Sequence, residues 1–537
     1  MSISRLVPGR YPPPTTSPIA DKIRERRGAR GLTPLDGTLL HVPPVAEGWN
    51  SLLGAVRTKG KLSADIRELM ILRVAAINHA AFEWIHHEHV ARDAGLTTEQ
   101  LYVIRDISFL PSPGNVILSP LQTAALAFAH HSTSTVKVPP EVTLSLADAL
   151  HSSIASGSDD TESLAQDLLV ESAAVVASYN MVSRFLVSLD VAAMSDCPPP
   201  WPATKSAFKV PLSVDPANGV LEDGHFLYAE THVTDPDAPW IVCANSLLTT
   251  TDMWEWALEK MLAPRPHGAK ETFNVLLHDQ RGHGKSSFPS NTKPDGLQCT
   301  IPILASDIAY LISTLILPSS SSVRSTIDSE PKVHAVIGVS QGGAAALAFT
   351  AMYPLLTKSV VSCDTGPRTP EGNKAAWTER IELVKANGGG ENGMRKLAAI
   401  TVPRWFPAPS RFSSIYGRRP RSEALQAQIV TTSLDGFIVG ASALQNYDLL
   451  AGTGMNRCLL DVTGPADPKV LLIAGSLDGG GKVSSGMGKL RDAWNAKRIP
   501  AGGGSVKLEV IEGAGHLPMV DETEKWWDVV SKWLAGI

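Results

Sequence analysis

The sequence predicts two domains, an all-α domain at the N-terminus and an α/β domain with a helical cap at the C-terminus. Three observations support this fold class. Residues 63–94 and 161–191 contain no glycine or proline, which is typical of helices. Residues 195–204 contain four prolines and end this helical region. From residue 205 onward, short apolar runs alternate with helical stretches, which indicates a doubly wound parallel sheet.

The chain has 537 residues, too many for one ordinary core, and breaks in its pattern predict the boundaries of its parts. Within the helical part, Gly95 is expected to end one helix, and Thr97 with Gln100 forms a capping box that opens the next. The expected parts are an N-terminal arm (1–38), a helical domain (39–194), a proline-rich linker (195–204) and an α/β domain (205–537) with a cap over about 366–463.

Six apolar runs bounded by turn residues predict the buried parallel strands of the α/β domain. They are PWIVCANS (239–246), FNVLLHDQ (273–280), VHAVIGVS (333–340), KSVVSCDT (358–365), KVLLIAGS (469–476) and VKLEVIEG (506–513). Between residues 365 and 464 this rhythm stops, and helical sequence containing Trp and Arg predicts a cap inserted over the edge of the sheet.

Charge and cysteine content exclude several classes of protein. The 48 basic and 53 acidic side chains give a net charge of −5, which argues against nucleic acid as a partner. No run approaches the ~20 apolar residues of a membrane helix, and the N-terminus lacks the apolar segment of a secretory signal. The five cysteines are far apart, with no C-x-x-C pair, so we expect no disulfide framework, no metal and no cofactor. These features predict a cytoplasmic protein that acts on a small molecule.

A G-x-S-x-G motif, from Gly338 to Gly342, follows the apolar run VHAVI and precedes an alanine-rich helix. At such a strand-to-helix turn, the hydroxyl of Ser340 would project above the sheet as a nucleophile, and the N–H of Gln341 would help to bind an oxyanion. The second oxyanion donor is expected in the loop after PWIVCAN, at Ser246 and Leu247.

A serine nucleophile needs a base and an acid that orients the base. His516, in GAGH after the last predicted strand, is the expected base. Asp478, after the preceding strand, is the expected acid, with Asp364 and Asp467 as competing candidates. The chain order Ser, Asp, His is that of α/β-hydrolases, so residues 205–537 are predicted to adopt this fold.

This half contains the six segments NSLLTTTDMW, DQRGHGKSS, GVSQGG, WTERI (377–381), RWF (404–406) and GAGH. Together they resemble 3-oxoadipate enol-lactonases. The resemblance covers residues 205–537 and implies hydrolysis of a small enol-lactone that carries a free carboxylate. Insertions at 318–331 and around 479–486 depart from the family's pattern and leave the identity of the lactone open.

A substrate carboxylate would favour a cationic partner, ideally a bidentate arginine. Arg380 and Arg404 in the predicted cap are candidates. The alternative is that each is a surface arginine stacked on the nearby Trp377 or Trp405, and the sequence leaves both interpretations open.

In the helical domain, Glu83 and His87 stand four residues apart on one predicted helix and could form an acid–base pair. An ordinary ion pair on the helix surface is the alternative. Four histidines crowd this stretch, but they fall on different faces of the helix and no H-E-x-x-H is present, so a metal site is not expected.

The segment RELMILRVAAINHAAFEWIHHEHVARDAGLTTEQL resembles the carboxymuconolactone decarboxylase / alkylhydroperoxidase D superfamily, over about 40–190. The resemblance implies that Glu68 and His87 match the glutamate and histidine of the peroxidase relay, and that Glu83 and His87 match those of the decarboxylase branch. Ala80 and Glu83 occupy the peroxidase cysteine positions, so peroxidase activity is not expected.

These two families catalyse consecutive steps of protocatechuate degradation. The resemblance therefore implies a serine hydrolase that opens a 3-oxoadipate enol-lactone-like substrate, coupled to decarboxylation of a carboxymuconolactone by the helical domain. The alternative is an ester or lactone hydrolase of secondary metabolism whose helical domain is a non-catalytic oligomerisation module. In either case the superfamily's habit of forming helical oligomers implies a homo-oligomer assembled through the N-terminal domain.

Overall fold

The computed structural model divides into two compact units, Met1–Pro202 and Ala203–Ile537. The insertion expected at 318–331 lies outside the described residues, as do residues 408–420 and 453–456 of the cap. The structure describes residues 7–28, 31–108, 110–112, 114, 116–154, 161–212, 214–215, 219–220, 225–263, 272–287, 299–317, 332–407, 421–452 and 457–537.

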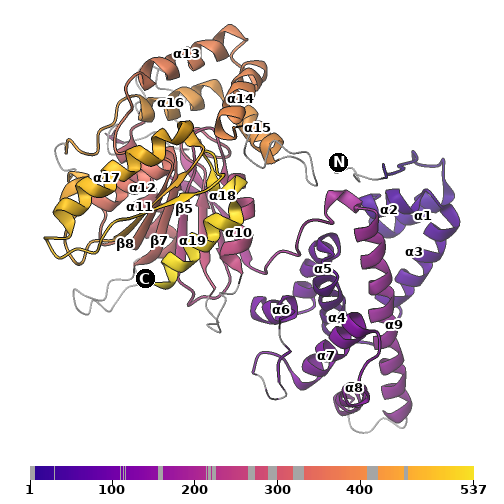
Figure 1. Cartoon of the computed structure of the whole chain (residues 1–537). Helices are drawn as coiled ribbons and strands as arrows, with labels where there is room; N and C mark the ends of the chain where they lie inside the picture. The colour runs from indigo at the N-terminus through magenta and orange to yellow at the C-terminus, as the bar shows by residue number, and fades with distance from the viewer. Residues whose placement is uncertain are drawn as a thin grey trace. The chain divides into compact units, whose positions relative to one another are not determined.

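The described part of the N-terminal unit is helical (Figure 1). Residues 63–94 form two helices, because His79 has a φ of 53° and interrupts the helical backbone between them. The capping box of Thr97 and Gln100 is confirmed, and Gly95 before it has a φ of 98°. The helices are α1 (Pro18–Arg27), α2 (Pro34–Leu39), α3 (Pro43–Thr58), α4 (Ala64–Ile77), α5 (Ala81–Asp93), α6 (Thr98–Arg105), α7 (Pro120–Thr135), α8 (Pro140–Ser153), α9 (Thr161–Ser188) and the 3-10 helix η2 (Val191–Ala193).

Helix α4 is the centre of this unit and contacts α5, α6, α7 and α9. Its residues 68–76 are all buried, which explains why the sequence there is apolar apart from Glu68 and Arg73. The expected N-terminal arm also contributes to the core, through Ala20 and Ile23 of α1 and Leu35 and Leu39 of α2. Burying each of the larger side chains contributes roughly 1.5–3 kcal/mol to folding.

The proline-rich segment packs along α6 of the same unit. The Nε of Arg105 donates to the carbonyl of Pro199 (2.8 Å), and the Arg105 guanidinium lies 4.5 Å from the centre of the Trp201 ring. Trp201 also stacks on Tyr102, with 5.4 Å between ring centres. The segment after α9 is therefore held by the helical unit as far as Pro202.

The C-terminal unit contains an eight-stranded sheet in the order β1-β4-β6-β5-β7-β8-β9-β10, with β2 and β3 paired separately. The six predicted runs form β5 to β10, and these strands pair in parallel. The sequence did not reveal β1 and β4, which extend the sheet in antiparallel fashion at one edge. The strands are β1 (Thr204–Pro211), β2 (Val214–Asp215), β3 (Gly219–Val220), β4 (Phe226–Val233), β5 (Trp240–Ala244), β6 (Asn274–His278), β7 (Val333–Val339), β8 (Thr357–Cys363), β9 (Lys469–Gly475) and β10 (Lys507–Ile511).

Helices cover both faces of this sheet (Figure 1). Helix α10 packs with α18 and α19, whereas α11 packs on α12 and α17 covers β9 and β10. These elements are η3 (Thr251–Trp254), α10 (Glu255–Leu262), α11 (Ile301–Leu311), the π-helix η4 (Ile312–Ile316), α12 (Gln341–Met352), η7 (Asp478–Gly481), α17 (Lys482–Arg498), α18 (Pro518–Asp521) and α19 (Thr523–Ala535).

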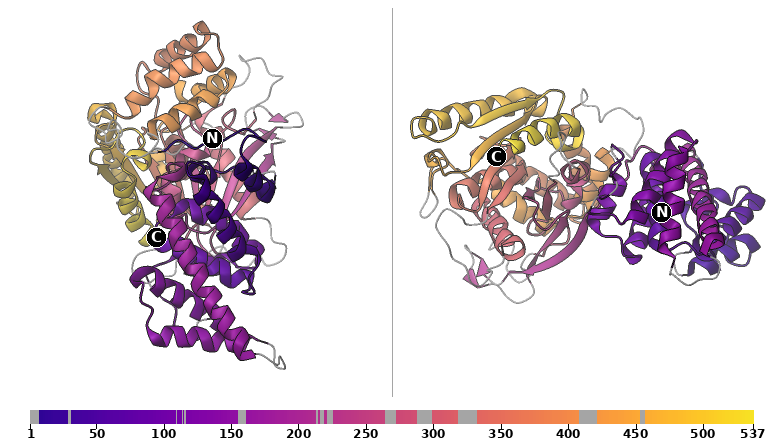
Figure 2. Two further views of the ribbon diagram at one scale, coloured as in Figure 1. Left: turned by 90° about the vertical axis from the view of Figure 1, so that its right-hand side faces the viewer. Right: turned by 90° about the horizontal axis from the view of Figure 1, so that it is seen from below.

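The predicted cap is present between β8 and β9, and its helices stand together at one end of the sheet (Figure 2). Several hydrogen bonds fix it to the loops at that end, two of which involve predicted site residues. The N–H of His516 donates to the carbonyl of Trp405 (2.8 Å), and the Nε2 of Gln341 donates to that of Gly440 (2.5 Å). The cap elements are α13 (Asn373–Ala386), α14 (Glu391–Trp405), α15 (Arg421–Thr431), α16 (Leu434–Gln445) and η6 (Leu459–Asp461).

Among the described residues, no single helix is both long enough and apolar enough to cross a membrane. Helices α15 and α16 meet that requirement only as a pair, and a bend of 104° separates them. All five cysteines are free thiols.

Candidate active site

Ser340 stands between β7 and α12 in a strained backbone conformation, with φ 56° and ψ −114°. Non-glycine residues rarely adopt such angles, and the surrounding structure must hold them in place. Here the N–H of Ser340 donates to the carbonyl of Cys363 (2.9 Å), and the N–H of Gly342 donates to that of Asn245 (3.0 Å). The turn is therefore anchored to the ends of β8 and β5.

The glycines of this turn are required by close backbone contacts. A Cβ added to Gly338 would lie 2.1 Å from the carbonyl oxygen of Gly342. One added to Gly342 would lie 2.2 Å from the carbonyl oxygen of Ala244. The G-x-S-x-G pattern thus lets strand, turn and helix pack closely while the serine occupies the bend.

Two buried backbone N–H groups lie in the loops around this turn. Gln341 begins α12, and Leu247 lies in the loop after β5; among the described residues, neither N–H has a hydrogen-bond acceptor. Leu248, with a φ of 71°, bends this loop, and the buried Oγ of Ser246 has no hydrogen-bond partner in the described part of the chain. Unpaired buried donors are rare, and these N–H groups are available to donate hydrogen bonds to an oxygen atom of a ligand.

His516 and Asp478 form a hydrogen-bonded pair. The Nδ1 of His516, after β10, donates to the Oδ2 of Asp478, after β9, across 2.8 Å. This tautomer leaves Nε2 as a proton acceptor. Burial alone would raise the pKa of Asp478, but His516, Asp364 and Arg404 together outweigh it and hold the pKa below its ordinary value.

Asp364, the competing candidate for the acid, directly follows β8, and the carboxylate that is hydrogen-bonded to His516 is that of Asp478. Oδ1 of Asp364 accepts the N–H of Gly475 (2.8 Å). Burial, and secondly the charge of Asp478, raise the pKa of Asp364 well above its ordinary value, which favours the protonated form of this acid. Asp467, the third candidate, lies in a turn where it accepts the N–H of Gly464 (2.7 Å).

Within the described ranges, Asp364, Asp478 and His516 are the one group of potential metal ligands that lies close together, with donor atoms within 4.8 Å of one another. Nδ1 of His516 and Oδ2 of Asp478 are already hydrogen-bonded to each other. The arrangement is that of a histidine base oriented by a carboxylate.

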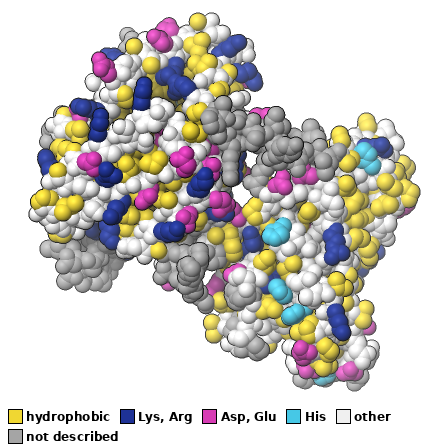
Figure 3. Space-filling model, in the orientation of Figure 1, with side chains coloured by type: hydrophobic (Ala, Val, Ile, Leu, Met, Phe, Trp, Pro, Cys, Tyr) yellow, Lys and Arg dark blue, Asp and Glu magenta, His cyan; other side chains and the backbone are white. Residues whose placement is uncertain are grey.

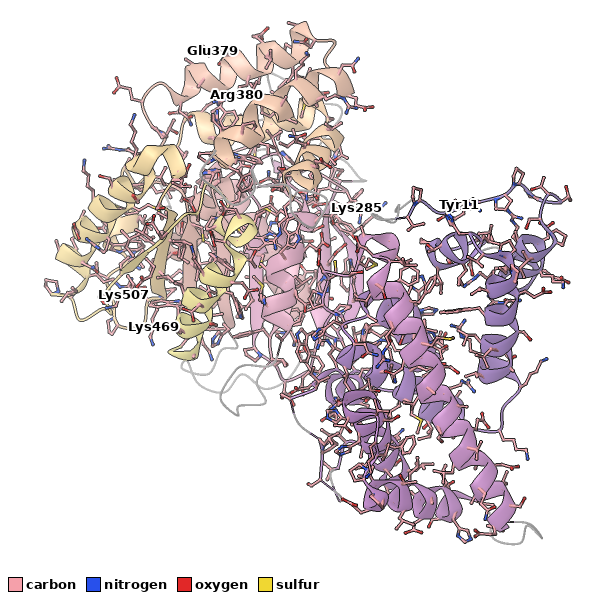
Figure 4. All side chains as sticks on the ribbon, turned by 45° about the vertical axis from the view of Figure 1, so that its right-hand side comes forward. Tyr11, Lys285, Glu379, Arg380, Lys469 and Lys507 are labelled. Atoms are coloured by element: carbon pink, nitrogen blue, oxygen red, sulfur yellow. The ribbon has the colours of Figure 1, made fainter. Side chains whose placement is uncertain are left out.

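The predicted arginines lie in the cap. Arg380 lies on α13 of the cap (Figure 4). Its guanidinium stacks over Trp377 at 4.6 Å, as one of the two sequence interpretations expected. Burial, and then the nearby Arg404, lower the pKa of Arg380 to about 10. Burial also lowers the pKa of Arg404, and the charge of Asp478 opposes that shift. Among the described residues, neither guanidinium has a hydrogen bond or an ion pair. Trp405 instead stacks on His516, with 6.1 Å between ring centres.

In the N-terminal unit, the structure pairs His87 with Glu68. Nδ1 of His87 on α5 lies 2.7 Å from Oε2 of Glu68 on α4. Glu83, predicted from its spacing to pair with His87, turns toward α9 instead and accepts the hydroxyl of Ser183 (3.0 Å). Burial raises the pKa of Glu83 well above its ordinary value and lowers that of His87. Burial therefore favours the neutral form of both groups.

Two residues that sequence reasoning did not identify complete this cluster. The hydroxyl of Tyr179 on α9 lies 3.2 Å from Nε2 of His87, and Nε of Arg57 on α3 donates to that hydroxyl across 2.6 Å. The SYNMVSRFL segment was predicted as a helix, but no sequence motif distinguishes Tyr179 or Arg57 from other residues on their helices.

Comparisons with known proteins agree with this architecture. Residues 241–529 match the alpha/beta hydrolase family, and residues 43–114 match the carboxymuconolactone decarboxylase family. A curated relative, 3-oxoadipate enol-lactonase 1 of Acinetobacter baylyi, is 25% identical over 303 residues, which span 56% of this chain and 90% of the relative. The two resemblances read from the sequence are confirmed, and with them the fold class.

Solved structures also resemble the chain. A hydrolase from Pseudomonas aeruginosa is 22% identical and covers 61% of this chain and 98% of its own, with a TM-score of 0.44. The enol-lactonase from Burkholderia xenovorans is 22% identical and covers 58% of this chain and 97% of its own, with a TM-score of 0.43.

Proposed function

The chain belongs to the alpha/beta hydrolase family, and from this premise we propose that its C-terminal unit hydrolyses a small carboxylated lactone of the 3-oxoadipate enol-lactone type. The hydrogen-bonded His516–Asp478 pair carries the proposal, because it lies at the same sheet edge as the strained Ser340 turn. The enol-lactonase relative supports this substrate class.

In the proposed reaction, Oγ of Ser340 attacks the lactone carbonyl while Nε2 of His516 takes the hydroxyl proton. Asp478 stabilises the resulting imidazolium, and the N–H groups of Gln341 and Leu247 bind the oxyanion. The ring C–O bond then breaks, and the leaving enolate is protonated and becomes a ketone. Water, activated by His516, cleaves the acyl-enzyme and releases a carboxylate and free Ser340.

The two cap arginines favour a substrate that carries its own carboxylate. Arg404 is close enough for its positive charge to lower the pKa of Arg380, and no described residue neutralises either arginine through an ion pair. Half-buried cations in this situation are stabilised by an anion that binds between them. The ring of Trp377 beneath Arg380 orients this guanidinium while leaving its N–H groups available.

Arg404→Gln is expected to raise KM for the carboxylated lactone by about tenfold to a hundredfold, because one charged hydrogen bond contributes roughly 1.5–3 kcal/mol. Its activity on the neutral ester p-nitrophenyl acetate should change little. Arg395→Gln, an exposed change on the same helix, is the matched control. Equal losses on both substrates would show that Arg404 is structural.

We further propose that the N-terminal unit decarboxylates a carboxymuconolactone. The match to the decarboxylase family supports this assignment, as does the burial of Glu68, Glu83 and His87 within one cluster. The C–CO2 bond would break with its electron pair remaining on the substrate carbon. The neutral carboxylic acid of Glu83 would then donate its proton to that carbon and be reprotonated from water, while Glu68 holds the His87 ring.

Glu83→Gln and His87→Ala are each expected to lower CO2 release from a carboxymuconolactone by about a hundredfold, the lower range for general acid–base catalysis. Glu88→Gln, on the same helix, is the control. Release is measured with 14C-labelled substrate, and circular dichroism verifies the fold. Unchanged release in both variants would remove these residues from the reaction.

The second candidate function makes the helical unit an assembly module for an ester or lactone hydrolase. Exposed Val45 and Leu52 on α3 and Met181 on α9 favour it, and hydrophobic side chains gather along the edge of this unit over α1 and α3 (Figure 3). An oligomer that releases no CO2 from any carboxylated lactone would support the module.

The free thiols favour a location in a reducing compartment such as the cytoplasm.

A further inference from the structure

A chain of hydrogen bonds runs through the N-terminal unit from a buried carboxylate to a half-buried arginine. It connects Glu68 to His87 (2.7 Å), His87 to Tyr179 (3.2 Å) and Tyr179 to Arg57 (2.6 Å), and four different helices supply its members. Since Arg57 is always a donor, it occupies a lone pair of the Tyr179 oxygen. The tyrosine proton therefore points to Nε2 of His87, and Nδ1 of His87 donates to Glu68.

The outer end of this chain has unused hydrogen-bonding capacity. Only Nε of Arg57 is engaged, and within the described residues its Nη1 and Nη2 have no hydrogen-bond or ion-pair partner. Burial would lower the pKa of Arg57, but Tyr179, Glu68 and Glu83 outweigh it and raise the pKa, so the guanidinium stays charged. Two donors in a planar fork on a fixed cation match the geometry of a carboxylate.

A second cation lies at the same place. Arg26 on α1 is exposed, and its Nε donates to Oδ1 of Asn50 (2.6 Å). Burial, followed by the charges of Arg27 and Arg57, lowers the pKa of Arg26. Arg27 is neutralised by an ion pair with Asp36 (2.6 Å), which leaves the positive charges of Arg26 and Arg57 to attract an anion.

We propose that Arg57 is a carboxylate-binding residue of the helical unit, and that Tyr179 is a positioning residue that holds Arg57 against the His87–Glu68 pair. The ligand class is a small organic anion with one or two carboxylates, and Arg26 adds to its attraction. This inference rests on the proposed decarboxylation for the identity of the substrate, although the anion site itself does not require it.

The test uses the full chain carrying Ser340→Ala, Arg380→Gln and Arg404→Gln, which disable the hydrolase site. Adipate, a six-carbon dicarboxylate, is titrated by calorimetry, and CO2 release from a carboxymuconolactone is measured in parallel. Arg57→Gln should weaken adipate binding by about tenfold or more, and Arg57→Lys should restore part of it. Arg184→Gln, an exposed change on α9, should have no effect.

Tyr179→Phe distinguishes positioning from simple packing. It keeps the buried ring but loses both hydrogen bonds of the hydroxyl, so it should weaken adipate binding and lower kcat for CO2 release while circular dichroism shows that the helical unit stays folded. Adipate binding that does not depend on Arg57, or no binding at all, would overturn the inference. Arg57-dependent binding without CO2 release would support the anion site and reject decarboxylation instead.

Discussion

Ser340→Ala is expected to lower kcat for ester and lactone hydrolysis by about 10⁴-fold or more, the scale seen when a serine nucleophile is removed from a catalytic triad. The physical reason is that no acyl-enzyme can form without the hydroxyl, whereas the oxyanion donors at Gln341 and Leu247 stay in place. His516→Ala should cause a similar loss, because the serine then lacks its base.

The controls for this prediction separate chemistry from folding. Ser340 has the positive φ of a strained turn, so alanine there must adopt the same backbone, and the melting temperature of the variant is measured first. Ser531→Ala, on α19 away from the turn, should retain full activity. Purified, folded Ser340→Ala that turns over a p-nitrophenyl ester at the wild-type rate would exclude this mechanism.

Asp478→Asn is expected to lower kcat by about 10³-fold or more, since asparagine neither stabilises the His516 imidazolium nor favours the correct tautomer. Asp364→Asn should reduce kcat by less than about tenfold. Asparagine resembles the protonated acid of Asp364, because its Oδ1 can still accept the N–H of Gly475 and its Nδ2 can donate to Asp478. The reverse order of effects would assign the acid role to Asp364.

The raised pKa of Asp364 also predicts how the stability of the folded protein changes with pH. The pKa is raised in the folded protein, so above the unfolded pKa of about 3.9 the unfolded chain loses a proton that the folded chain retains. The contribution of Asp364 to stability is therefore complete below about pH 4 and is lost as pH rises toward its folded pKa. Asp364→Asn, neutral at every pH, should gain stability relative to wild type across this range in urea denaturation.

The placement of the proposed hydrolase residues could be predicted because it depends on strand ends. Parallel strands carry the residues that follow them to one edge of the sheet, and Ser340, Asp478 and His516 follow β7, β9 and β10 at that edge whatever the loop lengths between them. Their catalytic roles stay predictions. The sequence could not decide between Asp478 and Asp364, since both follow neighbouring strands. That choice depends on the orientation of the side chains, and in the structure His516 is hydrogen-bonded to Asp478.

The N-terminal cluster was only partly predictable. Helical spacing suggested that Glu83 and His87 would pair, but tertiary packing turns Glu83 toward Ser183 on α9 and brings Glu68 to the histidine. Contacts between helices far apart in sequence leave no local signal. The sequence also failed to reveal β1 and β4. Strand β1 is largely exposed and its sequence is not an apolar run. Strand β4 is buried between β1 and β6, but Glu230, Thr231 and His232 interrupt its apolar residues.

Covalent labelling of the full chain with diisopropyl fluorophosphate, followed by peptide mass spectrometry, reports directly whether Ser340 is an activated nucleophile. The reagent phosphorylates a serine only where a base activates it. We expect one diisopropylphosphoryl group per chain, located on Ser340, with loss of hydrolase activity in proportion to labelling and no labelling of His516→Ala. Labelling of a different residue, or full activity after stoichiometric modification of Ser340, would contradict the proposed mechanism.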